Sequence, residues 1–183
     1  MSLHTLKVAG LERNLPKIQI NDELAIASFV MLGDTELIER CAEHLSVHPD
    51  FPKGEIDFLV CPEAKAIPLT HALARLLDID YVVARKSVKG YMVEPMIEKV
   101  QSITTIGAQT LVLDRCDVLM LTNKNVFIID DVVSTGGSLA GLEKLLSNID
   151  CKVVGKGAVL LEDAGYENDE LIYLEKLPIF STK

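Results

Sequence analysis

The sequence has no apolar run near the roughly 18 residues needed to cross a bilayer, and its start, MSLHTLKVAG, lacks the apolar core of a secretion signal. Its four cysteines lie far apart without a C-x-x-C pair, which argues against a zinc ribbon or a redox centre. Positive charge is scarce, because 18 Lys and Arg face 27 Asp and Glu and the net charge is -9. This balance argues against a general nucleic-acid or acidic-membrane surface. We therefore expect a cytoplasmic protein in which a local cationic pocket holds any anionic substrate.

One combination of cysteine and histidine resembles a metal site. Cys41, His44 and His48 have spacings of three and four, which would place them on one face of a helix. Only three ligands are offered, and Pro49 predicts that the helix ends by His48. We therefore favour the plainer interpretation, in which these residues belong to an ordinary helix.

Length and composition are those of one globular domain. The chain has 183 residues, of which 49% are hydrophobic and 25% are charged, and no repeat or long linker interrupts it. We therefore expect a single domain over residues 1–183. Apolar periodicity predicts strands that alternate with helices, as in an α/β protein with a parallel sheet. The expected strands cover residues 56–61, 81–84, 126–129 and 153–161, and the expected helices cover residues 34–46, 66–77 and 137–147.

The segment 126–139, VFIIDDVVSTGGSL, is the most informative part of the chain. Its four leading apolar residues predict a strand buried on both faces, and leucines at helical spacing follow it. The turn between them, residues 134–138, offers small side chains, hydroxyls and free backbone N–H groups at a helix N-terminus, which suits a phosphate. Asp130 and Asp131 cannot also face that phosphate, because like charges repel, so we expect them to bind hydroxyls or a cation. A phosphate beside a diol indicates a sugar phosphate.

The spacing excludes two better-known phosphate loops. A Walker loop requires a Lys before its Ser or Thr, and a dinucleotide fingerprint requires glycines spaced G-x-G-x-x-G. Neither occurs here. A buried strand, an Asp-Asp pair, two apolar residues and then small-Thr-Gly-Gly-small resemble instead the phosphoribosyl diphosphate motif of the type I phosphoribosyltransferases. The alternative is an ordinary strand, turn and helix with acidic residues at the strand end, and too many positions coincide for us to favour it.

The resemblance extends over most of the chain and is closest to the adenine and xanthine branch of that family. It implies a type I phosphoribosyltransferase-like α/β fold, in which helices flank a parallel sheet and the N- and C-terminal segments form a small hood. In this chain the hood would comprise residues 1–33 and 162–183. The strand-like residues 171–180 would then be peripheral, and the acidic stretch 162–170 would be solvated surface.

Two further loops follow expected strands, at the carboxyl ends where open α/β sheets bind their ligands. The first, with Glu63, Ala64 and Lys65, resembles the loop that holds the pyrophosphate of the sugar donor in the family. The second, RKSVK at residues 85–89, carries three cations in five residues, as a leaving pyrophosphate requires. Taken alone, each would be an ordinary charged surface loop. Beside the main motif, we interpret both as pyrophosphate sites.

Residues 90–109 do not fit a strand of the expected sheet or one of its flanking helices. A segment of about 20 residues between core strands is typically a lid or a binding loop. It resembles the mobile hairpin that closes over the donor in these enzymes, where closure would exclude water. Adenine-specific members commonly carry a Glu shortly before the loop glycine, whereas this chain has Thr105 there. A threonine is more similar to the xanthine branch, so the choice of base stays open.

Together, these features imply a purine phosphoribosyltransferase, which transfers ribose 5-phosphate from phosphoribosyl diphosphate to a purine and releases pyrophosphate. Adenine is the first expectation for the base. The alternatives are a xanthine- or guanine-type base, and a regulator that binds phosphoribosyl diphosphate without chemistry. The resemblance also implies a homodimer. We expect Mg²⁺ to be held near the two aspartates by substrate oxygens and water, without direct protein ligands.

The proposed reaction assigns roles to residues of all these loops. Electrostatic stabilisation, rather than a nucleophilic side chain, would supply most of the rate. The residues expected to act in catalysis are Asp130, Asp131, Lys86 and Thr105. The residues expected to bind substrate are Ser134, Thr135, Gly136, Gly137, Ser138, Glu63, Ala64, Lys65, Arg85, Lys89 and, in the hood near the base, Val30.

Overall fold

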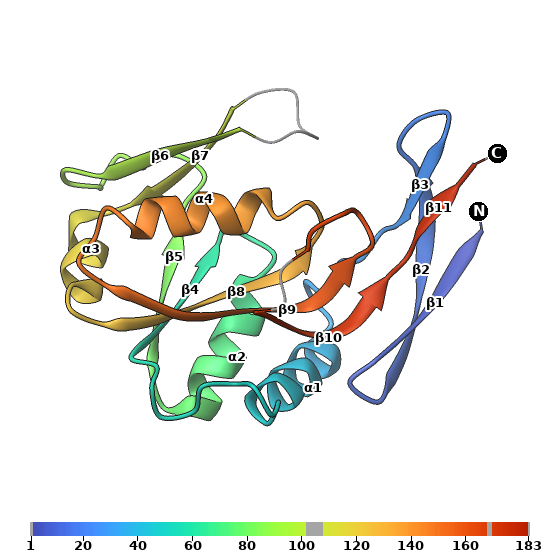
Figure 1. Cartoon of the computed structure of the whole chain (residues 1–183), viewed down its shortest axis with the longest axis horizontal. Coiled ribbons are helices and arrows are strands. Elements are labelled where there is room, and N and C mark those ends of the chain that lie inside the picture. The colour runs from blue at the N-terminus through green and yellow to red at the C-terminus, as the bar shows by residue number, and fades with distance from the viewer. Residues whose placement is uncertain (1, 102–107, 168–169, 183) are drawn as a thin grey trace.

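The computed structural model describes residues 2–101, 108–167 and 170–182. Its centre is a five-stranded parallel sheet in the order β10-β9-β8-β4-β5 (Figure 1). These strands are β4 (Phe58–Pro62), β5 (Asp80–Ala84), β8 (Asn125–Val133), β9 (Lys152–Glu162) and β10 (Leu171–Leu177). The predicted α/β architecture is confirmed. The apolar strand expected at residues 126–129 is the middle strand β8, which continues through both aspartates.

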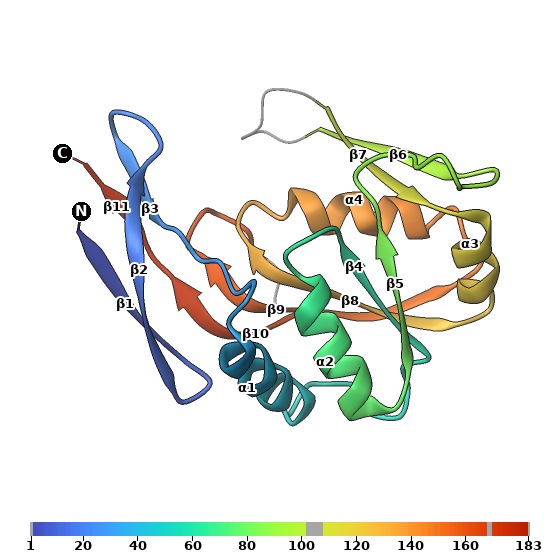
Figure 2. The same cartoon turned by 180° about the vertical axis from the view of Figure 1, so that it is seen from behind.

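Helices cover both faces of this sheet (Figure 2). On one face lie α1 (Thr35–Ser46) and α2 (Ile67–Leu77), and on the other lie α4 (Gly137–Leu146) and the short α3 (Arg115–Leu121). Helix α1 starts where its sequence indicates, because the carboxylate of Asp34 accepts the N–H of Leu37 (3.1 Å). None of the helices in the described ranges is long and apolar enough to span a membrane.

Two glycines of β9 make room for an aromatic ring of β8. The ring of Phe127 in β8 lies against Gly155 and Gly157 of β9, and it is fully buried. A Cβ at Gly155 would lie 2.8 Å from the ring, and a Cβ at Gly157 would lie 3.0 Å from it. The glycines therefore make room for the aromatic ring that fills this face of the core.

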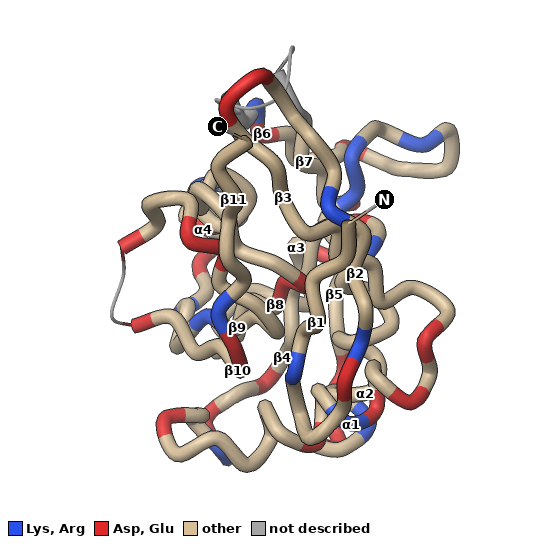
Figure 3. The backbone as a smooth tube through the Cα atoms, turned by 90° about the vertical axis from the view of Figure 1, so that its right-hand side faces the viewer, with Lys and Arg blue, Asp and Glu red and all other residues tan. Residues whose placement is uncertain are grey.

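The hood is a separate antiparallel sheet in the order β1-β2-β3-β11 (Figure 3). Its strands are β1 (Leu3–Val8), β2 (Leu11–Gln19), β3 (Leu24–Ala27) and β11 (Ile179–Ser181). The expectation that residues 171–180 are peripheral is wrong for most of this segment. Strand β10 pairs in parallel with β9 in the central sheet and buries Leu171, Ile172 and Leu177, so only β11 joins the hood.

The segment predicted to form a lid contains a hairpin of β6 (Met96–Gln101) and β7 (Ala108–Leu113). An ion pair between Glu98 of β6 and Lys144 of α4 (2.5 Å) ties the hairpin to the helix that follows the phosphate motif. Helix α3, which comes next, was not predicted from the sequence. Its signal is Asp114, which forms a capping box with Asp117.

Candidate active site

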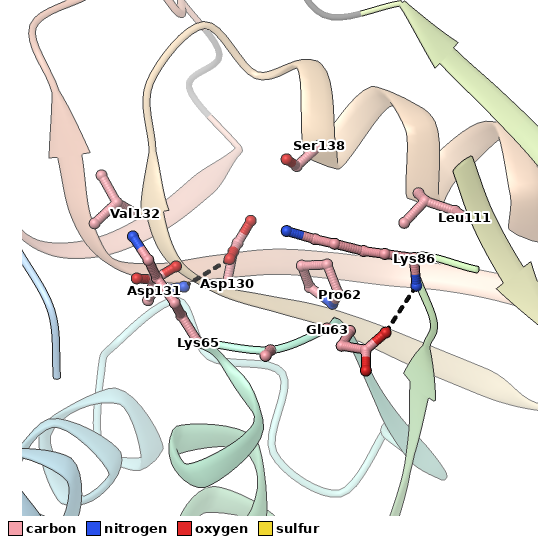
Figure 4. Close-up of a pocket in the computed structure, with 10 residues that line it drawn as sticks. Pro62, Glu63, Lys65, Lys86, Leu111, Asp130, Asp131, Val132 and Ser138 are labelled. Carbon is pink, nitrogen blue, oxygen red and sulfur yellow. Dashed lines mark hydrogen bonds between the residues drawn. The ribbon is translucent and has the colours of Figure 1, made fainter. Parts of the chain in front are cut away.

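A pocket opens where β4, β5 and β8 end and α4 begins (Figure 4). It contains predicted residues from all three loops, which lie far apart in the sequence. Parallel strands bring their carboxyl ends to the same edge, and that arrangement joins the loops. The residues that line the pocket are Pro62, Glu63, Ala64, Lys65, Lys86, Leu111, Asp130, Asp131, Val132 and Ser138.

Asp130 and Asp131 form the acidic part of the pocket, and each is only 6% exposed. Burial, and next the negative charge of Asp131, raise the pKa of Asp130 well above its ordinary value. One oxygen of Asp130 accepts the N–H of Asp131 (2.8 Å). The Oδ2 atom of Asp131 is buried without a hydrogen-bond partner among the described residues. Since an unpaired buried oxygen costs about 1–3 kcal/mol, this atom is suited to accept a hydrogen bond from a ligand.

The turn between β8 and α4 has the features of a phosphate site. Gly136 is the residue before the helix, with φ +80°, and no side chain caps the N–H groups of the first turn. These donors and the helix dipole favour an anion. Behind the turn, the ring of Tyr166 packs so closely that a Cβ at Gly136 would lie 2.2 Å from it. The side chain of Thr135 is exposed, and Ser138 lines the pocket.

Ser134, in the same turn, forms a hydrogen bond with a neighbouring strand. Its hydroxyl donates to Glu162 of β9 (2.6 Å), so this side chain is engaged with the neighbouring strand. Glu162 is only 9% exposed. The expectation that the acidic stretch 162–170 is solvated surface is therefore wrong at its first residue, because β9 carries that residue into the sheet edge beside β8.

The cations predicted to bind pyrophosphate divide into two groups. Lys65 and Lys86 line the pocket, and Figure 4 shows the Lys86 side chain extended across it toward the two aspartates. Arg85 and Lys89 do not line it. The guanidinium of Arg85 lies 3.1 Å from a carboxylate oxygen of Glu63, and the ammonium of Lys89 donates to a nearby serine hydroxyl (2.7 Å). The peptide bond between Glu63 and Ala64 is cis.

Two other sequence candidates, Val30 and the Cys41 cluster, do not join this site, and a third falls outside the part of the chain that the structure describes. Thr105 lies outside the described residues. Val30 is 53% exposed in the link from the hood to α1 and does not line the pocket. Cys41 is fully buried while His44 of the same helix is exposed, and no cluster of three or more potential metal ligands occurs in the part of the chain that the structure describes.

Two apolar lining residues were not identified from the sequence. Val132 follows the two aspartates directly in the sequence, and this position next to them was the signal that could have identified it as a lining residue. Leu111 lies on β7, and the sequence holds no signal for its place in the pocket, because that place depends on β7 running beside the end of β5.

Comparison with known proteins finds similarity to phosphoribosyltransferases and to a transcriptional repressor. Residues 31–177 match the family model of the phosphoribosyl transferase domain. The chain is 32% identical over 126 residues to adenine phosphoribosyltransferase of Corynebacterium jeikeium, which covers 69% of this chain and 58% of that protein. It is 30% identical over 136 residues to the purine biosynthesis transcriptional repressor PurR of Bacillus subtilis (73% and 47%). It is 31% identical over 133 residues to hypoxanthine/guanine phosphoribosyltransferase of Methanosarcina acetivorans (73% and 65%). The chain thus spans about half to two thirds of the length of these relatives.

Solved structures agree with this match in fold. The adenine phosphoribosyltransferase from Thermoanaerobacter pseudethanolicus superposes with a TM-score of 0.70 at 21% identity, over 88% of this chain and 95% of that one. The enzyme of the same name from Saccharomyces cerevisiae gives 0.67 at 19% identity, over 93% of each chain. Since the family model covers residues 31–177 and these structures superpose over most of the chain, the chain belongs to the phosphoribosyltransferase family and has its type I fold.

Proposed function

We propose that this protein is a purine phosphoribosyltransferase, which moves ribose 5-phosphate from phosphoribosyl diphosphate to a purine nitrogen and releases pyrophosphate. One observation carries the proposal. The buried oxygen of Asp131, which has no hydrogen-bond partner among the described residues, lies beside Asp130 in a pocket that also contains Ser138 at the start of α4 and two lysines. A sugar that carries phosphate groups at both ends fits this combination of acidic groups, helix N-terminus and cations.

In the proposed reaction, each part of the pocket has one role. The N–H groups at the start of α4 bind the 5-phosphate. Asp130 and Asp131 accept the ribose hydroxyls and favour the positive charge that develops on the ring as the bond to pyrophosphate breaks. Lys65 and Lys86 stabilise the departing pyrophosphate. Because the charges lie in a partly closed pocket, they act more strongly than they would in water.

Mg²⁺ fits the donors of this pocket as a companion of the substrate. The free Oδ2 of Asp131 is a hard oxygen that suits a water carried by the ion. The ion would be held by substrate oxygens and water, with the two aspartates nearby, and it would supply positive charge at the pyrophosphate. The side chains of the pocket still bind and orient the sugar.

We propose a purine as the base, with adenine first and a 6-oxopurine second. The names of the relatives support both, since one is an adenine enzyme and another a hypoxanthine/guanine enzyme. Activity should be assayed against a panel of purines and pyrimidines, with phosphoribosyl diphosphate and Mg²⁺. A strict pyrimidine preference would contradict the proposal.

A regulator that binds phosphoribosyl diphosphate without chemistry is the second candidate. The similarity to the repressor PurR favours it, because that relative is named for control of transcription rather than for catalysis. Calorimetric binding of the donor, run beside the activity panel, separates the two candidates. Donor binding without transfer to any base would favour the regulator, whereas transfer with turnover would exclude it.

A further inference from the structure

Glu63 places a negative charge where a pyrophosphate is expected to bind. It lines the pocket together with Lys65 and Lys86, which attract the same anion. A free carboxylate at this position would repel a phosphate group by Coulomb's law. The contacts of Glu63 with the loop after β5 account for a carboxylate at this position.

The loop that follows β5 engages both carboxylate oxygens of Glu63. Oε2 accepts the backbone N–H of Lys86 (2.9 Å), and Oε1 lies 3.1 Å from Nη2 of Arg85. The backbone N–H of Glu63 donates to the carbonyl of Ala84 at the end of β5 (2.9 Å). The hydrogen bond from Lys86, more than any other contact, lowers the pKa of Glu63 and keeps it ionised.

Arg85 does not line the pocket, and several contacts anchor it beside Glu63. Its backbone N–H and carbonyl both pair with Val112 of β7 (2.8 Å each). Its Nη1 atom lies 3.3 Å from the hydroxyl of Tyr91, whereas its Nε atom is buried without a hydrogen-bond partner among the described residues. The guanidinium therefore neutralises Glu63 instead of reaching the pocket, and the next residue, Lys86, extends into it (Figure 4).

We propose that Glu63 is a positioning residue that clamps the two pyrophosphate loops together. Lys65 and Lys86 repel each other and have flexible stems, so they would separate if their loops were independent. Through its bonds to Arg85 and to the backbone of Lys86, Glu63 holds the loops so that both ammonium groups face one anion. This inference rests on the proposed function for the identity of the anion.

The clamp and simple electrostatics predict opposite signs for one substitution. Glu63→Ala removes a negative charge from an anion site, so electrostatics alone predicts tighter binding of pyrophosphate. The clamp predicts weaker binding, by about 10- to 100-fold, because a bond between a charged group and a backbone N–H is lost and the lysines are released. Glu63→Gln still offers a carbonyl oxygen to the N–H of Lys86 but loses the charge opposite Arg85. Its pyrophosphate affinity should therefore fall by less than that of Glu63→Ala.

Pyrophosphate with Mg²⁺ should be titrated calorimetrically into the wild type, both Glu63 variants and Glu39→Ala, with thermal melts of each. Glu39 forms an exposed ion pair with Arg75 between α1 and α2, so its variant is a matched control that should bind like the wild type. Steady-state kinetics of Glu63→Ala should show a lower kcat and a higher KM for phosphoribosyl diphosphate, with an unchanged KM for the base. A merely destabilised protein would not separate the two substrates in this way.

Each outcome decides the clamp separately from the proposed function. Equal or tighter pyrophosphate binding by Glu63→Ala overturns the clamp, even where transfer is observed. Weaker binding by this variant, in a protein whose wild type transfers to no base, supports the clamp and overturns the proposed function. A wild type that does not bind pyrophosphate overturns both. If Glu63→Ala melts below the assay temperature, Glu63→Gln decides the sign, and binding at least as tight as that of the wild type overturns the clamp.

Discussion

Replacement of Asp130 by Asn should make the protein more stable and nearly inactive. Asp130 is 6% exposed, and its raised pKa means that its charge is unfavourable in the folded state. Asparagine keeps an oxygen for the N–H of Asp131 and adds an N–H donor beside the unpartnered carboxylate oxygen of that residue. Removing a buried charge that lies beside a second carboxylate should stabilise the fold by about 1–3 kcal/mol. At about 2–4 °C per kcal/mol for a chain of this size, Tm should rise by about 2–12 °C.

The same substitution should lower kcat/KM by about 10²–10³, since it removes a charge that favours the cationic sugar. Asp150→Asn is the control, because it removes the same charge from an exposed residue and should change stability by less than about 0.5 kcal/mol. Melts followed by circular dichroism and rates measured with excess donor test both effects. A lower Tm, or turnover equal to that of the wild type, would refute the reasoning.

The pH dependence of this effect has a defined sign. Folded Asp130 binds its proton at a higher pH than the unfolded chain does, where aspartate has a pKa of about 3.9. The folded state therefore holds more protons in the window above that value, and the contribution of Asp130 to wild-type stability falls as pH rises through the raised pKa. The stability advantage of Asp130→Asn should be small in acid, grow with pH and then level off. Wild-type turnover should fall as pH decreases through the same raised pKa, because protonation removes the catalytic charge.

Three further predictions test the rest of the site and the assembly. Gly136→Ala should lower Tm and donor affinity, since it adds about 1–3 kcal/mol of strain at φ +80° and a clash with Tyr166. Gly33→Ala, at φ +86° with no atom within 4 Å of its Cβ, carries only the strain, so equal losses of stability would disprove the clash. Thr135→Val should weaken donor binding by about 1–3 kcal/mol through a lost hydrogen bond to phosphate, and unchanged affinity in calorimetry would count against this role. We also predict a homodimer, so light scattering should give about twice the 20.1 kDa of one chain, and a monomer that turns over at micromolar concentration would contradict it.

Local patterns in the sequence determined most of the elements and the chemical type of the site. An apolar run followed by two aspartates predicts a buried strand with carboxylates at its end, because burial on both faces requires continuous apolar residues. Small residues and glycines after it predict an uncapped helix start, because only glycine adopts φ +80° without strain. These signals depend on neighbours within a few positions, so they can be recognised from the sequence without the tertiary structure.

Only the tertiary structure decided what lies opposite each charge. Arg85 and Glu63 are 22 positions apart, and both looked like pyrophosphate ligands until the ends of β4 and β5 brought them into contact. Glu162 looked solvated, but β9 places it beside Ser134, and β10 looked peripheral until it paired with β9. Periodicity in the sequence shows that a strand is buried, but it does not show which strand pairs with it. The role of a charged residue depends on its neighbours in space, which local sequence patterns do not give.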